Sequence, residues 1–235
     1  MNSRAPVLLV VILSAAMVAC GCTSSNQGFP PATPPTTLPN QIETTVSTPS
    51  PSPIQNISTT RTQLDKAWRD IQVAYDTYKE KRDRLGATDT GVQTNDDISY
   101  LRQTLIPDAI SAYQSIEMDL SSMNISNPDL DSEKKVLLSI CDYKIKYFEG
   151  LDAGYQGIVL EATNVKKSRD AYKNAKYSFQ DAIDVINVMG IGISSVPSEK
   201  QPPYSQKYWD YIYQDKVRIE DLLAWADENV SRLAS

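Results

Sequence analysis

The sequence predicts an all-α protein, a mainly antiparallel bundle of about five helices that follows a disordered stalk rich in Pro, Ser and Thr. Three observations predict this. From Leu64 to Leu233, apolar residues recur at spacings of three and four, the period of a helix that buries one face. No segment in this region alternates apolar and polar residues over the length of a strand. Residues 23–60 are mostly Pro, Ser, Thr and Asn, so they have almost nothing to bury and should stay extended.

The first two expected helices are bounded by local signals. The first begins near residues 60–62 and ends at Gly86, a residue that suits a helix C-terminus. Its seam contains Leu64, Trp68, Ile71, Tyr75, Tyr78, Arg82 and Leu85. The second begins at residues 94–96, and Pro107 should kink it or split it after Ile106. Its inner face contains Ile98, Leu101, Leu105, Ala109, Ala112, Ile116, Leu120 and Met123.

Three more helices follow. The third starts at Asn127-Pro128, a capping residue followed by proline in the first turn. Its stripe contains Leu130, Leu137, Cys141, Ile145, Phe148, Leu151, Tyr155 and Ile158. The fourth follows a turn at residues 163–167 and should end at Gly190-Ile191-Gly192; its stripe contains Val165, Ser168, Tyr172, Ala175, Phe179, Ala182, Ile186 and Met189. The fifth starts near Ser205 and carries Tyr208, Ile212, Ile219, Leu222, Leu223, Ala226, Val230 and Leu233.

The N-terminal segment has the layout of a secretory signal. Arg4 is its only charged side chain, residues 7–13 are all aliphatic, and small residues precede Cys22. The apolar core is shorter than the ~20 residues of a membrane span. Gly21-Cys22-Thr23-Ser24 resembles the lipobox of prokaryotic lipoproteins, in which a peptidase cuts before a cysteine that carries the lipid. The resemblance implies cleavage before Cys22, with Cys20 as the other register. An uncleaved N-terminal anchor is the alternative, and both place the domain outside the cell on a membrane.

The chain therefore divides into a signal segment at residues 1–21, a lipid-anchor site and stalk at 22–60, and a helical bundle at 61–235. A fully polyproline-like stalk of ~38 residues would reach on the order of 100 Å. Three Asn-x-Ser sequons, at Asn56, Asn124 and Asn229, are candidate glycosylation sites. Together with the Ser/Thr/Pro-rich stalk, they resemble archaeal surface lipoproteins.

The composition removes the side chains on which most familiar catalytic sites depend. The chain has no histidine, which is the commonest general base and transition-metal ligand. It also lacks a Gly-rich phosphate loop and a Gly-x-Ser-x-Gly elbow. We therefore expect no catalytic residue, no metal and no cofactor. Cys141 has no cysteine partner in the bundle and lies on an apolar stripe, so we expect a buried, unreactive thiol. A net charge of −6 disfavours nucleic acid as a partner.

Two features are candidate ligand or partner surfaces. Gly150, Gly154 and Gly157 lie on one face of the third helix, and each mid-helix glycine costs about 1 kcal/mol relative to alanine. Close packing of a neighbouring helix is the preferred explanation; a break and a pocket floor are the alternatives. The fifth helix opens with an aromatic stretch that includes Tyr204, Tyr208, Trp209, Tyr211 and Tyr213. Burial on both faces is preferred there, and an exposed platform for a sugar or protein is the alternative.

The sequence thus predicts a membrane-tethered extracellular helical bundle with a non-enzymatic structural or interaction role at the cell surface. The alternative is a receptor-like module that binds a ligand, such as a carbohydrate or protein, at the glycine face or the aromatic stretch. The expected partners are the membrane, through the lipid or anchor, and a cell-surface protein or glycan.

Changing Cys22 to Ser should abolish signal cleavage and lipid attachment, because the thiol that carries the lipid is then missing. Metabolic labelling with a lipid precursor, followed by detergent partition, measures both. Cys20→Ser is the matched control and should leave labelling intact. Normal labelling of the Cys22→Ser variant would assign the attachment to Cys20.

Overall fold

Helices make up almost all of the part of the chain that the structure describes. The computed structural model describes residues 57–91, 94–194 and 205–234. Its elements are α1 (Ile57–Arg84), α2 (Asn95–Tyr100), the π-helical turn η1 (Leu101–Leu105), α3 (Ile106–Ser122), α4 (Pro128–Glu161), α5 (Val165–Ser194) and α6 (Ser205–Arg232). Because α2, η1 and α3 follow one another without a gap, these residues form five rods. Their only β structure is an isolated bridge between Thr88 and Gly91. The predicted all-α bundle of five helices is confirmed.

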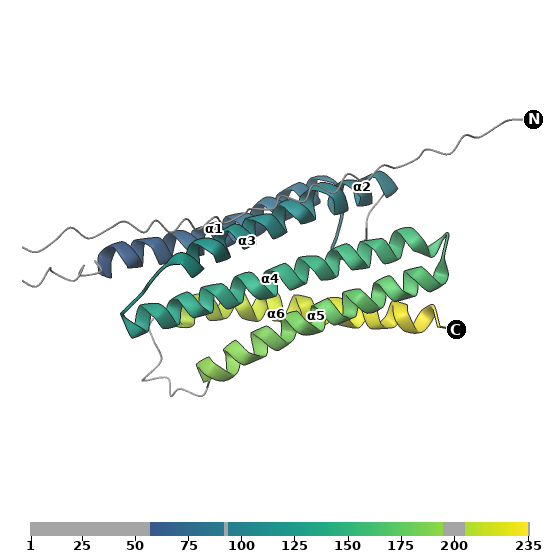
Figure 1. Cartoon of the computed structure of the whole chain (residues 1–235). Helices are drawn as coiled ribbons and strands as arrows, with labels where there is room; N and C mark the ends of the chain where they lie inside the picture. The colour runs from purple at the N-terminus through teal and green to yellow at the C-terminus, as the bar shows by residue number, and fades with distance from the viewer. Residues whose placement is uncertain (1–56, 92–93, 195–204, 235) are drawn as a thin grey trace, which may run out of the picture. The chain divides into compact units, whose positions relative to one another are not determined.

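The central helix of the bundle is α4. It contacts α1, α2, η1, α3, α5 and α6, which are all the other helical segments of the described residues. Figure 1 shows α1 and α3 side by side above α4, with α5 and α6 below it. Side chains of α4 therefore contact both the upper and the lower helices, and α1 also reaches α6 directly, as Trp68 does at Tyr208.

Capping residues set the helix ends where the sequence predicts them. The side-chain oxygen Oδ1 of Asn127 accepts hydrogen bonds from the backbone N–H groups of Asp129 (3.0 Å) and Leu130 (3.1 Å) at the start of α4. Thr94 Oγ1 accepts from the backbone N–H of Asp97 at the start of α2. Gly86, just after α1, has a φ of 63°, the left-handed conformation that ends many helices at glycine.

Two predicted boundaries differ from the structure. α1 begins at Ile57 rather than near residue 60, so the helical part of the chain starts slightly earlier. The prediction that Gly190-Ile191-Gly192 ends a helix is wrong, because α5 continues to Ser194. A helical glycine costs only about 1 kcal/mol, which lowers helix stability without forcing a stop.

The π-helical turn η1 accommodates Pro107. Proline lacks an N–H and its ring crowds the carbonyl four residues earlier, and a π turn widens the helix at that point. The N–H of Ile106 bonds to the carbonyl of Leu101, five residues back, and the helix continues rather than splitting after Ile106. The turn contains one extra residue, so the buried stripe restarts at Ile106. Tyr113 is consequently fully buried, whereas Ala112, predicted for the inner face, is only partly buried.

Most of the predicted seam residues form one continuous core. In α1, six of the seven predicted positions are buried, namely Leu64, Trp68, Ile71, Tyr75, Tyr78 and Arg82. Cys141 is fully buried, and burial raises the pKa of its thiol to about 12, which confirms the buried thiol. One assignment is wrong, because Val165 is 52% exposed at the start of α5. In α4, Lys144 is buried in the seam, and its neighbour Ile145 is partly buried against the core.

An aromatic ring covers each of the three glycines of α4. The pairs are Gly150 with Phe179, Gly154 with Trp225, and Gly157 with Tyr172. A Cβ atom on any of these glycines would lie 2.5 to 2.9 Å from its nearest ring carbon, too close for an unstrained contact. The helix is continuous through them, so the break is excluded, and neighbouring helices do pack against this face. The close neighbours are rings from α5 and α6 rather than another backbone, and these rings occupy the space that a ligand would need.

Gly154→Ala should lower the stability of the domain by about 1 kcal/mol. Overpacking against Trp225 costs about 1–3 kcal/mol, and the helix propensity of alanine returns roughly 1 kcal/mol. Gly150→Ala should cost more, because the Phe179 ring that it meets is fully buried. Urea unfolding measures both, with the exposed Gln156→Ala on the same helix as the control. A higher melting temperature for Gly154→Ala would show that this face is open.

Candidate functional site

Four charged side chains are buried in the described bundle, and three of them lie on α4 and α6. They are Arg82, Glu133, Lys144 and Asp215. An isolated buried charge costs several kcal/mol, so each must find a partner of opposite charge and further hydrogen bonds. Their surroundings show whether they form a reactive site or a structural one.

The ammonium group of Lys144 is enclosed by tyrosine rings and one carboxylate. Its Nζ lies 2.7 Å from Oδ2 of Asp215 on α6, and the hydroxyl of Tyr143 donates to the same oxygen at 2.7 Å. The Nζ atom also lies 3.9 Å from the ring centroid of Tyr75 and 4.8 Å from that of Tyr211, within the range of cation–π attraction. Burial lowers the pKa of Lys144, and Asp215 opposes that shift. The pair joins α4 to α6, and the Tyr75 ring extends the contact to α1.

The network continues through the loop after α1. The carboxylate of Asp89 accepts a hydrogen bond from the Tyr147 hydroxyl (3.1 Å) and pairs with Arg82. Arg218 lies between the two acids, with Nε 3.9 Å from Asp89 and a terminal nitrogen 3.4 Å from Asp215. Burial alone would lower the pKa of Arg82, but Asp89 reverses this and the pKa is raised. These cations and carboxylates neutralise one another inside the bundle.

Glu133 forms a second, separate buried contact near the start of the domain. Its carboxylate pairs with Arg61 in the second turn of α1 and accepts a hydrogen bond from the Tyr208 hydroxyl at 2.6 Å. The Tyr208 ring packs edge-on against Trp68, with centroids 4.8 Å apart. This contact ties the first turns of α1 to α4 and α6, close to the point where the predicted stalk joins the domain.

These buried groups link the helices through pairs of opposite charge. Each charge is satisfied by a neighbouring charge or hydroxyl, and tyrosine rings close the space around them. Within the described residues, no group of three or more His, Cys, Asp or Glu side chains is placed to hold a metal ion. A buried network of paired charges and hydrogen bonds fixes the register of helices. The hydroxyls of Tyr78 and Tyr211 are buried beside it without a hydrogen-bond partner among the described residues.

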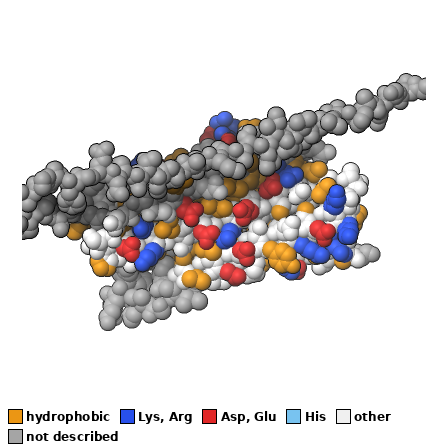
Figure 2. Space-filling model, viewed as in Figure 1, with side chains coloured by type: hydrophobic (Ala, Val, Ile, Leu, Met, Phe, Trp, Pro, Cys, Tyr) orange, Lys and Arg blue, Asp and Glu red, His pale blue; other side chains and the backbone are white. Residues whose placement is uncertain are grey.

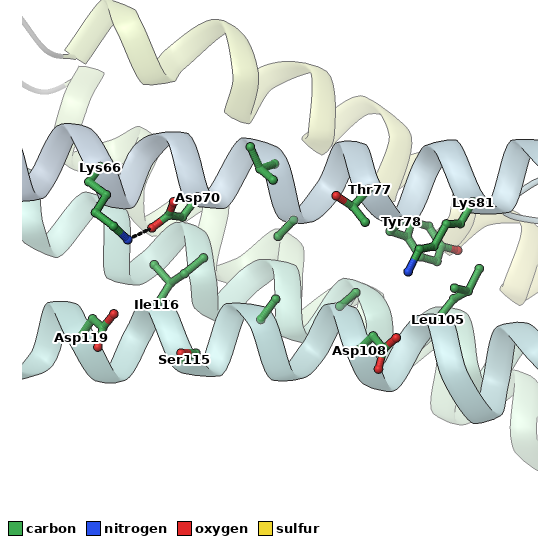
Figure 3. Close-up of a pocket in the computed structure, with 14 residues that line it drawn as sticks. Lys66, Asp70, Thr77, Tyr78, Lys81, Leu105, Asp108, Ser115, Ile116 and Asp119 are labelled. Carbon is green, nitrogen blue, oxygen red and sulfur yellow. Dashed lines mark hydrogen bonds and ion pairs between the residues drawn. The ribbon is translucent and has the colours of Figure 1, made fainter.

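The candidate site is an open groove between α1 and α3, shown in Figure 3. The hollow has a volume of about 410 Å³, and an adjoining hollow of about 270 Å³ extends it past Asp119. Its apolar lining contains Val73, Ala74, Ala109, Ala112 and Ile116. Its charged rim contains Lys66, Asp70, Lys81, Asp108 and Asp119. Small alanine side chains leave the space between the helices unfilled, and Val73 is 60% exposed beside it.

The sequence indicates this groove only weakly, because the apolar seam is the more prominent pattern. Beside the seam of α1 runs a second stripe, Lys66, Asp70, Val73 and Thr77, at spacings of four, three and four. On α3 the groove depends on Ala112 facing outward, which follows from the extra residue in η1.

Away from the groove, Figure 2 shows acidic and basic side chains intermixed over much of the visible face.

The predicted modification sites fall in different surroundings. Cys20, Cys22 and Asn56 lie outside the described residues. Asn124 is exposed in the turn between α3 and α4. The amide nitrogen of Asn229 on α6 donates to the carbonyl of Trp225 at 2.8 Å, so this sequon is less accessible than that at Asn124.

The aromatic stretch at the start of α6 is divided between core and surface. Tyr204 lies outside the described residues. Tyr208 is fully buried, and Tyr211 packs edge-on against Trp68 with centroids 5.1 Å apart. Trp209 is half-buried and Tyr213 is 57% exposed, so among the described residues of this stretch these two rings are available to a partner.

Comparison with known proteins assigns no family to this chain: no family model, curated protein or solved structure matches it. Among the described helices, none has the length and apolar character needed to cross a membrane.

Asp215→Asn should destabilise the domain by about 3–5 kcal/mol near neutral pH, because it leaves the buried ammonium of Lys144 without its counter-ion. Lys144→Met is the matched control and should cost less, since it removes the buried cation while Asp215 keeps Tyr143 and Arg218. Chemical denaturation of the three proteins measures the difference. Equal losses for the two variants would contradict the assigned role of the pair.

The loss caused by Asp215→Asn should also shrink as the pH rises. Because burial holds the pKa of Lys144 below its value in the unfolded chain, the unfolded chain binds more proton there, and stability increases with pH between the two pKa values. Removing Asp215 lowers the folded-state pKa of Lys144 further. The pH range over which stability rises then extends to lower pH. The comparison is made at about pH 7 and about pH 9, where only roughly a tenth of an unfolded tyrosine is ionised. A stability difference between the wild-type protein and Asp215→Asn that grows with pH would refute this account.

Proposed function

We propose that this chain is a lipid-anchored extracellular protein whose helical bundle has a non-enzymatic structural or interaction role at the cell surface. The observation that carries the proposal is the order of segments: a secretory signal, a lipobox-like cysteine and a Pro/Ser/Thr-rich stalk precede the domain. A stalk of this composition lifts a domain away from a membrane, where it can meet other surface components.

The bundle itself supports a structural or binding role. Its buried acids and bases pair with one another, as Lys144 does with Asp215, rather than converging on a cavity. The groove between α1 and α3 is open to solvent and has an apolar lining and a charged rim. Such a surface suits a protein partner better than a reaction, because binding needs complementary shape and charge without a general base.

A receptor-like ligand-binding module is the second candidate, and the groove volume favours it. A hollow of about 410 Å³ lies within the ~300–1,000 Å³ of typical ligand pockets. The groove is the candidate ligand site in this alternative. The glycines of α4 no longer are, because aromatic rings cover them. The half-exposed pair Trp209 and Tyr213 remains a place where a glycan could stack.

Brief protease treatment of intact cells should release the helical domain. The stalk is the accessible segment, whereas the helices from Ile57 onward are protected by packing. Mass spectrometry of the supernatant should find a resistant fragment that begins close to Ile57, and a cytoplasmic protein should stay intact as the control. A domain that becomes sensitive only after the cells are lysed would overturn the surface location.

A further inference from the structure

The rim of the α1–α3 groove has opposite charges on its two sides. The basic lip is formed by Lys66 and Lys81 of α1, and the acidic lip by Asp108 and Asp119 of α3. Lys66 also pairs with Asp70 on its own helix at 2.6 Å. Within the described residues, Lys81, Asp108 and Asp119 take part in no salt bridge. Three exposed charges without a salt bridge therefore border an apolar hollow.

The two lips are in register because α1 and α3 run antiparallel. Figure 3 shows Asp119 across the groove from Lys66 at one end, and Asp108 across from Lys81 at the other. Fifteen residues separate the two lysines, which corresponds to about 22 Å of helix. Counting seven residues inward from Lys66 and Asp119 places Val73 and Ala112 opposite each other near the centre. The face is therefore a strip with paired charges at its ends and an apolar middle.

We propose that a second copy of this chain occupies the groove, related to the first by a two-fold axis that runs parallel to the groove. Such an axis places α1 of each copy on α3 of the other. Lys66 then meets Asp119 of the second copy, Lys81 meets Asp108, and each pair occurs twice. Val73 enters the hollow over Ala112 of the second copy, which buries an exposed valine and fills the unoccupied space.

The other two-fold arrangement is disfavoured by charge. An axis across the groove would place α1 on α1, so that Lys66 of one copy would face Lys81 of the other. Like charges brought together in an interface cost free energy and suppress that arrangement. The charge pattern therefore selects the parallel axis among the two ways in which this face can meet itself.

The selected arrangement also suits two chains anchored in one membrane. A two-fold axis parallel to α1 leaves both copies of α1 pointing the same way, so both begin, at Ile57, at the same end of the dimer. Both preceding stalks then leave toward one membrane. This part of the inference rests on the proposed function, whereas the charge argument does not.

The size of the face explains why the membrane matters. A strip about 25 Å long and two helices wide, or about 20 Å, covers about 500 Å² per copy. That is below the ~800 Å² per partner of a standard interface, so association of free domains should be weak. Tethering on one surface raises the effective concentration toward the millimolar range and offsets this weakness. The dimer should form on membranes at densities for which the free chain is mostly monomeric.

Cysteine cross-linking of the full-length lipidated protein in vesicles tests the arrangement. Val73→Cys and Ala112→Cys are made in separate chains, and an oxidant is added to each alone and to their mixture. The expected result is a disulfide between residues 73 and 112 in the mixture, identified by mass spectrometry, and little product from either variant alone. Tyr177→Cys, at an exposed position on α5, measures random collisions. Cross-linking of residue 73 to itself, or no more product than the Tyr177→Cys control, would overturn the proposal.

Charge exchange in the two cysteine variants supplies a second test, because it changes the charged ends of the face and leaves residues 73 and 112 as they are. Lys81→Glu places like charges against Asp108 of the second copy and should reduce the 73–112 cross-link at least tenfold. Combining Lys81→Glu with Asp108→Lys restores opposite charges and should restore the product. Failure of the double variant to do so, while circular dichroism shows it folded, would contradict the pairing. Flotation with the vesicles is scored separately, so loss of the lipid anchor cannot be confused with loss of the dimer.

Discussion

The buried ammonium of Lys144 is the constraint on which the rest of the bundle depends. A cation in a closed core is tolerated only where a carboxylate and electron-rich rings surround it, and those groups come from different helices. Asp215 on α6 and Tyr75 on α1 must both reach one point on α4, which fixes the axial position and rotation of three helices at once. An apolar core of equal volume would tolerate more arrangements, because hydrophobic contacts have little directional preference.

The two sides of α4 solve the same packing problem in opposite ways. On the side of α5 and α6, glycines remove side chains so that rings such as Phe179 can lie directly on the helix backbone. On the side of α1, long tyrosine and tryptophan side chains fill a wider space and carry the polar network, as Tyr75 does. Both solutions place aromatic rings in the core. The aromatic content that resembles a binding platform in the sequence is therefore mostly used for packing, and the open groove lies where alanines are found.

The fold followed from local patterns, whereas three of the four buried charges and the groove did not. Spacing, the Asn127 cap and Gly86 identify the rods because helix boundaries depend on nearby residues. Lys144 has the seam spacing between Cys141 and Phe148, but hydrophobicity alone favours its neighbour Ile145. Asp215 fills the seven-residue gap between Ile212 and Ile219, where a seam position was required but no apolar residue stood. Which charge pairs with which depends on contacts between distant segments, and the pattern of a single helix contains no information about them.

The π-helical turn has a consequence for how this sequence can vary. It acts as a one-residue insertion that rotates everything after Leu105 by roughly 100° relative to an uninterrupted helix. Loss of a single residue there would turn Tyr113 away from the core, and the apolar lining of the groove would change with it. The number of residues between Ile98 and Ile106 should therefore vary less than the identity of those residues. Among relatives, chains that keep this length should keep the groove, and a one-residue deletion should occur only together with loss of Pro107 and replacement of the alanines that follow.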